Sequence, residues 1–345
     1  MCGASCVNHR HKLGSVIRSR IIGTGSYITG REVGNEEIAG PLNLSAEQVY
    51  QLTGIRSRHW ADEGQATSDL AVEACRRACV AGGKSPSSID AIVLSTTSPD
   101  TAFPSTACYV QRAFGGKSAL AFDVAASCSG FLYGLSMADA MIRSGQVRTC
   151  LVGAAEIKSR FLDPTDRETT LLFGDGAGAA LLTAEDSPVR EQSGIMAMRL
   201  YADGSGHDLI TVPGGGSRAP YRPDTIRSGQ HLLRMKGGAV FRMAVRRLER
   251  AVTDLLEEWG MSAENIDHVI MHQANARILE AIRRRLNISL DRMHSVIERY
   301  GNTSSASLPI ALDCAVREAP VRPGEVLLLG AFGGGLTWAT GLIRW

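Results

Sequence analysis

Residues 121–131, Ala-Phe-Asp-Val-Ala-Ala-Ser-Cys-Ser-Gly-Phe, contain the change of pattern that decides the fold. An apolar run typical of a buried strand stops at Ser127, and apolar residues at helical spacing begin after Gly130. We therefore expect Cys128 at the corner between a strand and a helix. Because unpaired N–H groups and the helix dipole stabilise a thiolate there, the pattern favours a nucleophilic cysteine. A buried structural cysteine is the alternative.

The composition indicates an α/β enzyme. The chain has 345 residues, of which 44% are hydrophobic, 21% are charged and 37 are glycines, which is enough for a large core with many tight turns. The formal net charge of +2 argues against a general nucleic-acid binder. No apolar run is long enough to span a bilayer, and the N-terminus lacks the apolar segment of a signal peptide. We expect no nucleic-acid partner and no membrane.

The cysteines indicate a reducing compartment. The eight cysteines, at positions 2, 6, 75, 79, 108, 128, 150 and 314, show no spacing typical of a disulfide framework, so we expect a cytoplasmic protein. Near the N-terminus four residues have the donor types of a zinc site, namely Cys2, Cys6, His9 and His11. Because too little apolar sequence surrounds them to close such a site, we instead expect a disordered leader over residues 1–12 and no metal.

The same plan occurs twice in the chain. A helix over 67–82, a break and a strand over 89–95 are matched by a helix over 240–260, a break and a strand over 266–272. Each copy then continues with a helix, a strand, a corner, a second helix and a second strand. In the first copy these are a helix over 106–114, a strand over 119–125, the corner at Cys128, a helix up to 144 and a strand over 149–153. In the second copy they are a helix over 276–286, a strand over 292–298, a corner at 301–304, a helix over 306–317 and a strand over 325–330.

The repeat predicts two similar halves, over 13–188 and 189–345. Their strands are too apolar to face water on either side, which favours two sheets with buried helices between them. Corresponding corners would then meet at a pseudo-twofold axis, with Cys128 and Asn302 in matching corners. His272, at the end of the first strand of the second copy, would lie beside them.

Glycine-rich segments elsewhere favour turns over nucleotide sites. Gly23 and Gly25, in a predicted strand over 15–27, lack the third glycine and the following helix of a dinucleotide fingerprint. The run over 173–179 leads into apolar residues and favours a tight turn before a strand. Residues 213–230 form the one long irregular segment, of a kind that often borders a site.

Four motifs together resemble one family. They are Cys-Ser-Gly-Phe at 128–131, His-Gln-Ala-Asn-Ala-Arg at 272–277, Gly-Asn-Thr-Ser-Ser-Ala-Ser at 301–307 and Ala-Phe-Gly-Gly-Gly-Leu-Thr-Trp at 331–338. In this order they resemble the β-ketoacyl-acyl-carrier-protein synthase III family of the thiolase superfamily. The resemblance implies a thiolase-like α/β fold with five αβαβα layers, in which two similar halves are related by a pseudo-twofold.

The resemblance also implies a decarboxylative Claisen condensation. An acyl group moves from acyl-CoA onto Cys128, and malonyl-acyl-carrier protein loses CO2 and attacks it, which starts fatty-acid synthesis. His272 and Asn302 would hold the enolate oxygen, and the backbone N–H groups of Cys128 and Gly334 would hold the tetrahedral oxygen. No cofactor is implied. Where degradative thiolases have a second cysteine and elongating synthases a second histidine, this chain has Asn302, which favours the priming type.

Substrate contacts follow from the same resemblance. The residues that match the pantetheine and coenzyme A channel of the family are Arg167, Gly237, Phe241 and Asn275. Phe103 matches a residue that reaches across a homodimer interface into the acyl pocket. The chain departs from the family at the adenine contact, because Gln48 and Leu52 replace a tryptophan and an arginine, so we do not expect the usual adenine stacking.

A basic helix is expected to dock the acidic acyl carrier protein. After His272 the sequence has four arginines where family members bind this partner, namely Arg277, Arg283, Arg284 and Arg285. A solvated helix face is the alternative interpretation.

Other functions remain open at this point. The same condensation could use a dicarboxylic primer such as a glutaryl thioester for biotin synthesis, bound by basic residues such as Arg160, Arg218, Arg222 and Arg227. Cys128 and His272 could instead transfer acyl groups to an alcohol or amine of secondary metabolism, without release of CO2. A catalytically silent binding protein of the thiolase fold is the third alternative.

Overall fold

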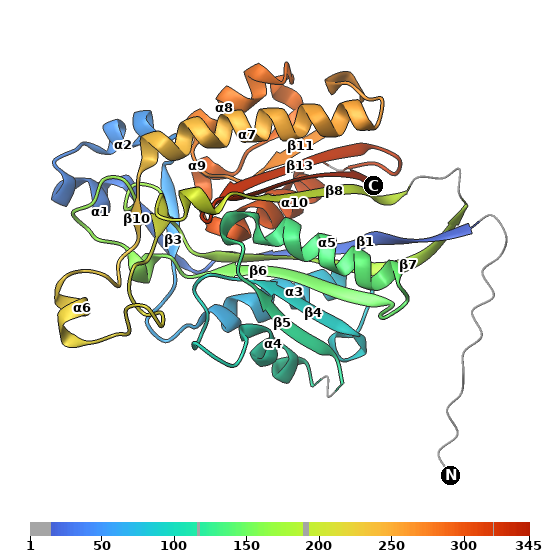
Figure 1. Cartoon of the computed structure of the whole chain (residues 1–345), viewed down its shortest axis with the longest axis horizontal. Helices are drawn as coiled ribbons and strands as arrows, with labels where there is room; N and C mark the ends of the chain where they lie inside the picture. The colour runs from blue at the N-terminus through green and yellow to red at the C-terminus, as the bar shows by residue number, and fades with distance from the viewer. Residues whose placement is uncertain (1–14, 116–117, 189–192, 320) are drawn as a thin grey trace, which may run out of the picture.

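Figure 1 shows a computed structural model of the chain, which describes residues 15–115, 118–188, 193–319 and 321–345. The expected leader over 1–12, including the candidate zinc ligands Cys2, Cys6, His9 and His11, lies outside the described residues. Two five-stranded mixed sheets form the centre of the described part of the chain.

The two sheets have the same strand order, β1-β7-β6-β4-β5 and β8-β14-β13-β11-β12. In each sheet, the last three strands of this order are parallel and the first two run antiparallel to their neighbours. The match confirms the internal repeat. The strands are β1 (Ser15–Tyr27), β4 (Ala91–Ser95), β5 (Leu120–Val124), β6 (Thr149–Glu156) and β7 (Gly176–Pro188), and β8 (Gly194–Ala202), β11 (His268–Met271), β12 (Met293–His294), β13 (Val326–Gly333) and β14 (Thr337–Arg344).

Helices and sheets alternate in five layers, as predicted (Figure 1). Between the sheets lie α5 (Gly130–Arg143) and α10 (Ser307–Glu318), whose fully buried side chains pack with strands of both sheets in one core. The outer faces of the two sheets are covered by α3 (Thr67–Ala81) with α4 (Thr106–Phe114), and by α7 (Gly237–Glu258) with α8 (Ala276–Arg285). Because both faces of each sheet are covered, the central strands are apolar throughout.

Shorter elements gather at one end of the layers, where Figure 1 labels α1, α2, β3, β10 and α6. The segment over 213–230, expected to be irregular throughout, contains α6, which has proline at its first position. These elements are β2 (Arg31–Gly34), α1 (Asn35–Ala39), α2 (Ala46–Thr53), β3 (Ser57–Trp60), β9 (Ile210–Thr211), α6 (Pro223–Arg227) and β10 (Arg234–Met235).

The strand expected over 292–298 is the clearest error of the sequence prediction. Only the two residues of β12 pair with the sheet, and the chain then forms the short helix α9 (Ile297–Tyr300). Gly301, at φ 64°, ends this helix. This backbone conformation is accessible to glycine without strain, and it turns the chain towards Asn302.

Gly23 and Gly25 pack β1 against α3. A Cβ atom at Gly23 would lie 2.3 Å from the carbonyl oxygen of Ala78, and one at Gly25 would lie 2.4 Å from that of Ala74. Both distances are far below van der Waals contact, so any larger residue would push the helix away from the sheet. The two glycines therefore have a packing role, in agreement with the rejection of a dinucleotide site.

Arg58 on β3 is a fully buried cation, and none of the ion pairs among the described residues includes it. Its Nη atoms donate hydrogen bonds to Asn35 Oδ1 at 2.8 Å and to the carbonyl oxygen of Leu171 at 2.9 Å. Burial lowers the pKa of Arg58 to about 10. The side chain thereby joins the segment around α1 to the loop that precedes β7.

Replacement of Arg58 by methionine should destabilise the fold, because the buried acceptors on Asn35 and Leu171 lose their donor. We expect Arg58→Met to lower the free energy of unfolding by about 3 kcal/mol. Arg56→Met is the matched control, since the exposed side chain of Arg56 forms a surface ion pair with Glu298 and stacks on the ring of Tyr50. Denaturant titration followed by circular dichroism measures both. Equal midpoints for the two variants would show that the buried hydrogen bonds contribute nothing.

Candidate active site

The N-termini of the two central helices meet between the sheets. Ser127 and Ser304 have left-handed φ angles of 49° and 53°, and each starts a 3₁₀ turn that leads into α5 or α10. By this equivalence the counterpart of Cys128 is Ser305. The two corners lie together, as predicted, with Cys128 in one and Asn302 in the other, although Asn302 stands three residues before the residue that is equivalent to Cys128.

A cavity of about 790 Å³ reaches this meeting point. Its wall includes all three predicted catalytic residues, Cys128, His272 and Asn302, together with Ser304 and Gly334. One small ligand in the cavity can therefore contact groups from both halves of the chain.

Cys128 is 7% exposed and opens to the cavity. Its Sγ lies 3.6 Å from Ser304 Oγ and 3.9 Å from Ser127 Oγ. Burial raises the pKa of the Cys128 thiol, and the nearby carboxylate of Glu156 adds to this effect, although the hydroxyl contacts and Lys158 oppose it. The group at rest is therefore a thiol, in contrast to the thiolate expected at the start of a helix.

His272 directly follows β11, and its Nδ1 lies 2.6 Å from Ser307 Oγ on α10. The same Oγ accepts the backbone N–H of Gln273 at 3.0 Å. Among the described residues, His272 is the one acceptor found for the Ser307 hydroxyl hydrogen, so this hydroxyl donates to Nδ1 and the ring proton resides on Nε2. Burial lowers the pKa of His272 to about 4. At neutral pH the ring is an uncharged donor.

Asn302 is held on both sides of its amide. Its Oδ1 accepts the backbone N–H of Ser304 at 2.9 Å, and its Nδ2 donates to the carbonyl oxygen of Ala274 at 3.3 Å. The backbone of Asn302 also pairs with Leu172 and Gly174, which come from the glycine-rich segment before β7. Because Oδ1 is occupied, Nδ2 is the atom that keeps a hydrogen for a ligand.

Gly333, the last residue of β13, and the next residue, Gly334, lie against the corner that holds Cys128. A Cβ atom at Gly333 would lie 2.6 Å from the backbone nitrogen of Cys128, and one at Gly334 would lie 3.3 Å from Ser127 Oγ. Thr337 Oγ1 donates to the carbonyl oxygen of Ala126 at 2.9 Å and so ties the two segments together. Only residues without a side chain permit this approach.

The four residues matched to the coenzyme A channel all border the cavity, namely Arg167, Gly237, Phe241 and Asn275. Asn275 is also the N-cap of α8, where its side chain accepts the N–H of Arg277 at 2.8 Å. A Cβ atom at Gly237 would lie 2.1 Å from Glu168 Oε2. Phe103 is different, since it does not border the cavity and is 85% exposed.

Gln48 and Leu52, the two residues that differ from the family pattern, lie on α2. Gln48 and Ser45 form a capping box at the start of α2, with the Ser45 N–H donating to Gln48 Oε1 at 2.8 Å. Leu52 is 44% exposed and borders the cavity. The adenine position of the family thus has a helix cap and an aliphatic side chain in this protein.

The four arginines of the predicted docking helix are not equivalent. Arg284 and Arg285 pair with Glu280 and Glu249. Arg283 is bound to Glu280 and to the carbonyl oxygen of Ile288, which makes it part of the local structure. Arg277 is exposed, borders the cavity and has no ion pair among the described residues.

Arg242 has the same properties and was missed by the sequence analysis. It lies on the first turns of α7, is exposed, borders the cavity and belongs to none of the ion pairs in the described part of the chain. The spacing of Arg242 and Arg246, one turn apart on an amphipathic helix, is the signal that could have indicated a basic face.

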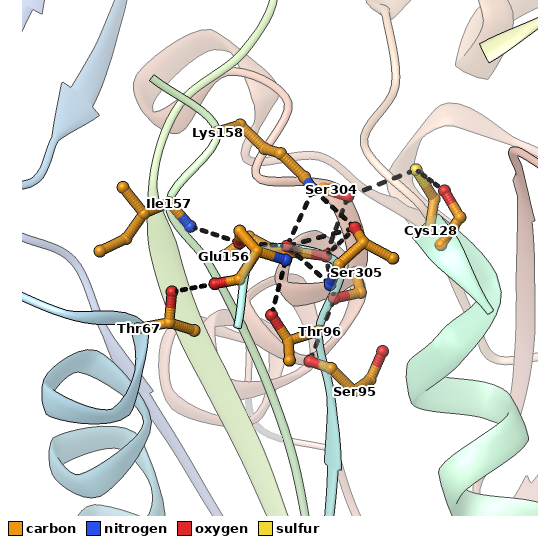
Figure 2. Close-up of polar contacts among 12 residues, drawn as sticks. Thr67, Ser95, Thr96, Cys128, Glu156, Ile157, Lys158, Ser304 and Ser305 are labelled. Carbon is orange, nitrogen blue, oxygen red and sulfur yellow. Dashed lines mark hydrogen bonds and ion pairs between the residues drawn. The ribbon is translucent and has the colours of Figure 1, made fainter. Parts of the chain in front are cut away.

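A buried polar cluster beside Cys128 was also missed (Figure 2). Glu156 ends β6 with no exposed surface, and its Oε2 lies 3.1 Å from Lys158 Nζ. Lys158 Nζ also donates to Thr97 Oγ1 at 2.6 Å. Ser304 Oγ donates to Glu156 Oε1 at 3.2 Å. The sequence signal that could have indicated this cluster is the pair of ionisable residues Glu156 and Lys158 at the end of an apolar run.

Within the described ranges, no group of three or more His, Cys, Asp or Glu residues is placed to hold a metal ion. In the same part of the chain, no helix has the length and apolar character needed to cross a membrane.

Comparison with known proteins agrees with this geometry. Residues 122–204 match the family model described as 3-oxoacyl-[acyl-carrier-protein (ACP)] synthase III, and residues 256–345 match the model of its C-terminal part. The chain is 46% identical to β-ketoacyl-[acyl-carrier-protein] synthase III of Erythrobacter litoralis over 330 residues, which cover 96% of this chain and 100% of the relative.

Solved structures give the same result. The crystal structure of 3-oxoacyl-[acyl-carrier-protein] synthase III from Aquifex aeolicus superimposes with a TM-score of 0.86 at 39% identity, covering 95% of this chain and 100% of the other. The priming β-ketosynthase of the R1128 polyketide pathway gives 0.87 at 33% identity, covering 96% and 97%. The chain therefore belongs to the acyl-transferring condensing enzymes of the β-ketoacyl-[acyl-carrier-protein] synthase III family.

Proposed function

We propose that this enzyme condenses an acyl-CoA primer, held as a thioester on Cys128, with malonyl-acyl-carrier protein, and so starts fatty-acid synthesis. The observation that carries the proposal is the cavity shared by Cys128, His272 and Asn302. It combines a nucleophile with two neutral hydrogen-bond donors, which is the set that this condensation needs.

Each group has a chemical role. Cys128 attacks the thioester carbonyl of the primer, and coenzyme A leaves as the thiol. Loss of CO2 from the malonyl group produces an enolate, whose oxygen is held by His272 Nε2–H and Asn302 Nδ2–H. The carbanion then attacks the acyl carbonyl on Cys128, and the backbone N–H groups of Cys128 and Gly334 hold the tetrahedral oxygen. Neutral donors suit this reaction because loss of CO2 moves the negative charge of the malonyl carboxylate to the enolate oxygen, where hydrogen bonds stabilise it without a change in net charge.

The remaining substrate contacts are proposed from their positions on the cavity. Arg167, Gly237, Phe241 and Asn275 would line the path of the pantetheine arm. Arg242 and Arg277, which keep unpaired charges beside the cavity, would meet the acidic carrier protein, and Arg284 and Arg285 would extend this surface. We assign Arg283 to local structure instead.

A dicarboxylic primer receives less support. None of the arginines considered for its distal carboxylate borders the cavity, and Arg160 is bound to the carbonyl oxygens of Asp62, Glu63 and Gln65. The other three of these residues are Arg218, Arg222 and Arg227. Plain acyl transfer to an alcohol or amine would not need the amide of Asn302, and a silent binding protein would not need the full set of donors.

Four wider properties belong to the same proposal. A homodimer would cover the exposed ring of Phe103, whose side chain would then reach the partner's acyl pocket. The cysteines support a cytoplasmic location, because none of the six in the described residues forms a disulfide. We place the division of the halves between β7 and β8, over 13–188 and 189–345, and propose that no cofactor takes part.

Acylation should depend on one sulfur. After incubation with acetyl-, branched, octanoyl- or glutaryl-CoA, intact-protein mass spectrometry should show one acyl group on the wild type and none on Cys128→Ala. Cys108→Ala is the matched control and should keep the adduct, since Cys108 lies on α4. His272→Ala and Asn302→Ala should still load but release CO2 from malonyl-acyl-carrier protein about 100-fold more slowly. An adduct on Cys128→Ala would contradict the proposal.

Decarboxylation should tolerate acid further than an exposed histidine allows. Since the pKa of His272 is lowered to about 4, the ring stays neutral from pH 8 down to pH 5 and charges only below that range. We expect the rate of CO2 release from malonyl-acyl-carrier protein, measured without primer, to stay constant between pH 8 and pH 5. In particular, the wild type should show no acidic decline in this range that is absent from His272→Gln. An acidic limb with its midpoint near the ordinary pKa of histidine, absent in His272→Gln, would contradict the burial argument.

Carrier-protein docking should depend most on the two unpaired arginines. Arg242→Glu and Arg277→Glu should each raise the KM for malonyl-acyl-carrier protein about tenfold and leave hydrolysis of a small acyl thioester unchanged. Arg112→Glu, on the outer face of the other sheet, is the control. Steady-state kinetics with both substrates gives the comparison. Equal changes for carrier protein and small thioester would refute docking at this surface.

A further inference from the structure

A chain of hydrogen bonds leads from the nucleophile to a buried carboxylate (Figure 2). Cys128 Sγ lies 3.6 Å from Ser304 Oγ, and Ser304 Oγ lies 3.2 Å from Glu156 Oε1. A carboxylate can only accept, so the single hydroxyl hydrogen of Ser304 points to Glu156. The thiol of Cys128 is then the donor to Ser304. The contacts define one direction for proton movement, from sulfur through the hydroxyl to the carboxylate.

No other described group near the thiol is placed to take its proton. His272 carries its proton on Nε2 and accepts the Ser307 hydroxyl at Nδ1, so neither nitrogen is free. Lys158 is the other charged group that acts on Cys128, and it is a cation. Ser127 donates to Sγ at 3.9 Å. Glu156 is therefore the one base that the thiol reaches through hydrogen bonds.

The structure keeps Glu156 ionised although it is fully buried. Its Oε2 accepts from Ser98 Oγ at 2.6 Å and pairs with Lys158, and its Oε1 accepts from Ser305 Oγ at 2.8 Å. Burial alone would raise the pKa of Glu156, but Lys158 and the hydroxyl donors outweigh it and hold this pKa below the ordinary value. A fixed, charged base thus lies one hydroxyl away from the sulfur.

We infer that Glu156, acting through Ser304, accepts the proton of Cys128 during acylation and returns it after condensation. This inference rests on the proposed function. As Sγ bonds to the primer carbonyl, its proton passes to Ser304 while the Ser304 proton passes to Glu156, and the CoA thiolate leaves and takes a proton from water. Attack of the carbanion on acyl-Cys128 later expels the cysteine thiolate, which recovers the proton by the reverse path. The cycle consumes one proton, as the decarboxylative condensation requires.

The order of events follows from acidity. In the resting enzyme the transfer is uphill, so Cys128 remains a thiol. When Sγ begins to bond to the carbonyl carbon, its hydrogen becomes strongly acidic and the nearby carboxylate takes it in the same step, which is general-base catalysis. Glu156 itself touches no substrate and acts only through Ser304.

Ser304→Ala is the cleanest test, because it removes the bridge and leaves Glu156 paired with Lys158. Ser305→Ala is its matched control, since Ser305 donates to the same Oε1 but makes no contact with Cys128. Single-turnover acylation is followed by rapid quenching and intact-protein mass spectrometry from pH 6 to pH 9, with acetyl-CoA or octanoyl-CoA, whichever loads the wild type faster. A second readout is the rate of alkylation by iodoacetamide, which reports the thiolate population without general-base catalysis.

The inference predicts a distinct pattern. Ser304→Ala should acylate at least about tenfold more slowly than wild type at pH 7, and its rate should rise about tenfold per pH unit because hydroxide must replace the internal base. Ser305→Ala should keep the shallow wild-type profile. Alkylation in Ser304→Ala should slow far less than acylation, because loss of the Ser304 contact only raises the pKa of the thiol, whereas a merely structural defect would slow both reactions by the same factor.

Three other results would overturn it. If Ser304→Ala and Ser305→Ala behave alike, or if the pH profile of Ser304→Ala keeps the wild-type slope, Glu156 is not the base, while acyl loading itself still supports the proposed function. If none of acetyl-, branched or octanoyl-CoA loads the wild type, the proposed function fails, and the relay fails with it. A charge-balanced variant, Glu156→Gln with Lys158→Met, repeats the test and should match Ser304→Ala.

Discussion

The close approach between Gly333 and the backbone nitrogen of Cys128 is the constraint on which the site depends. A Cβ atom at residue 333 would lie 2.6 Å from that nitrogen, so any side chain would separate the end of β13 from the start of α5. This contact joins the two halves at the nucleophile. The shape of the cavity beside Cys128 and the position of Gly334 both follow from it, because each needs the two backbones to lie side by side.

The pseudo-twofold arrangement has placed different chemistry at equivalent positions. Glu156 and Gly333 end the corresponding strands β6 and β13. At one position glycine faces Cys128, and at the other Glu156 accepts from Ser305, the counterpart of Cys128. One corner is thus an open reaction site with a nucleophile, and its twin is a closed polar cluster. The duplicated fold supplies two similar helix N-termini, and under our proposals one would serve substrate chemistry and the other proton transfer.

The sequence was enough to predict the layers of the fold and the residues that line the candidate site, but not the charge states of the groups in that site. Apolar strands and helical periodicity repeat in order, so the two sheets and their buried helices were predictable, and motifs at Cys128, His272 and Asn302 named the groups that line the cavity. The segment after His294 was misassigned because β12 has only two residues, too few for periodicity to show. Ionisation at Cys128 depends on burial and on Glu156, which come together only through folding. The ion pair of Arg285 with Glu249 joins two helices that a linear pattern does not bring together, whereas the pair of Arg284 with Glu280, four residues apart on one helix, was readable from the sequence.

The buried, protonated state of Cys128 also affects how fast its sulfur reacts with oxidants and electrophiles. Peroxides and soft electrophiles react with thiolates, and far more slowly with protonated, enclosed sulfur. On the proposed mechanism, the resting sulfur of Cys128 is therefore shielded from oxidative damage, and it becomes most reactive when an acyl thioester fills the cavity. A covalent inhibitor would need to carry its own recognition for this cavity, since the sulfur alone offers little to a small unspecific reagent.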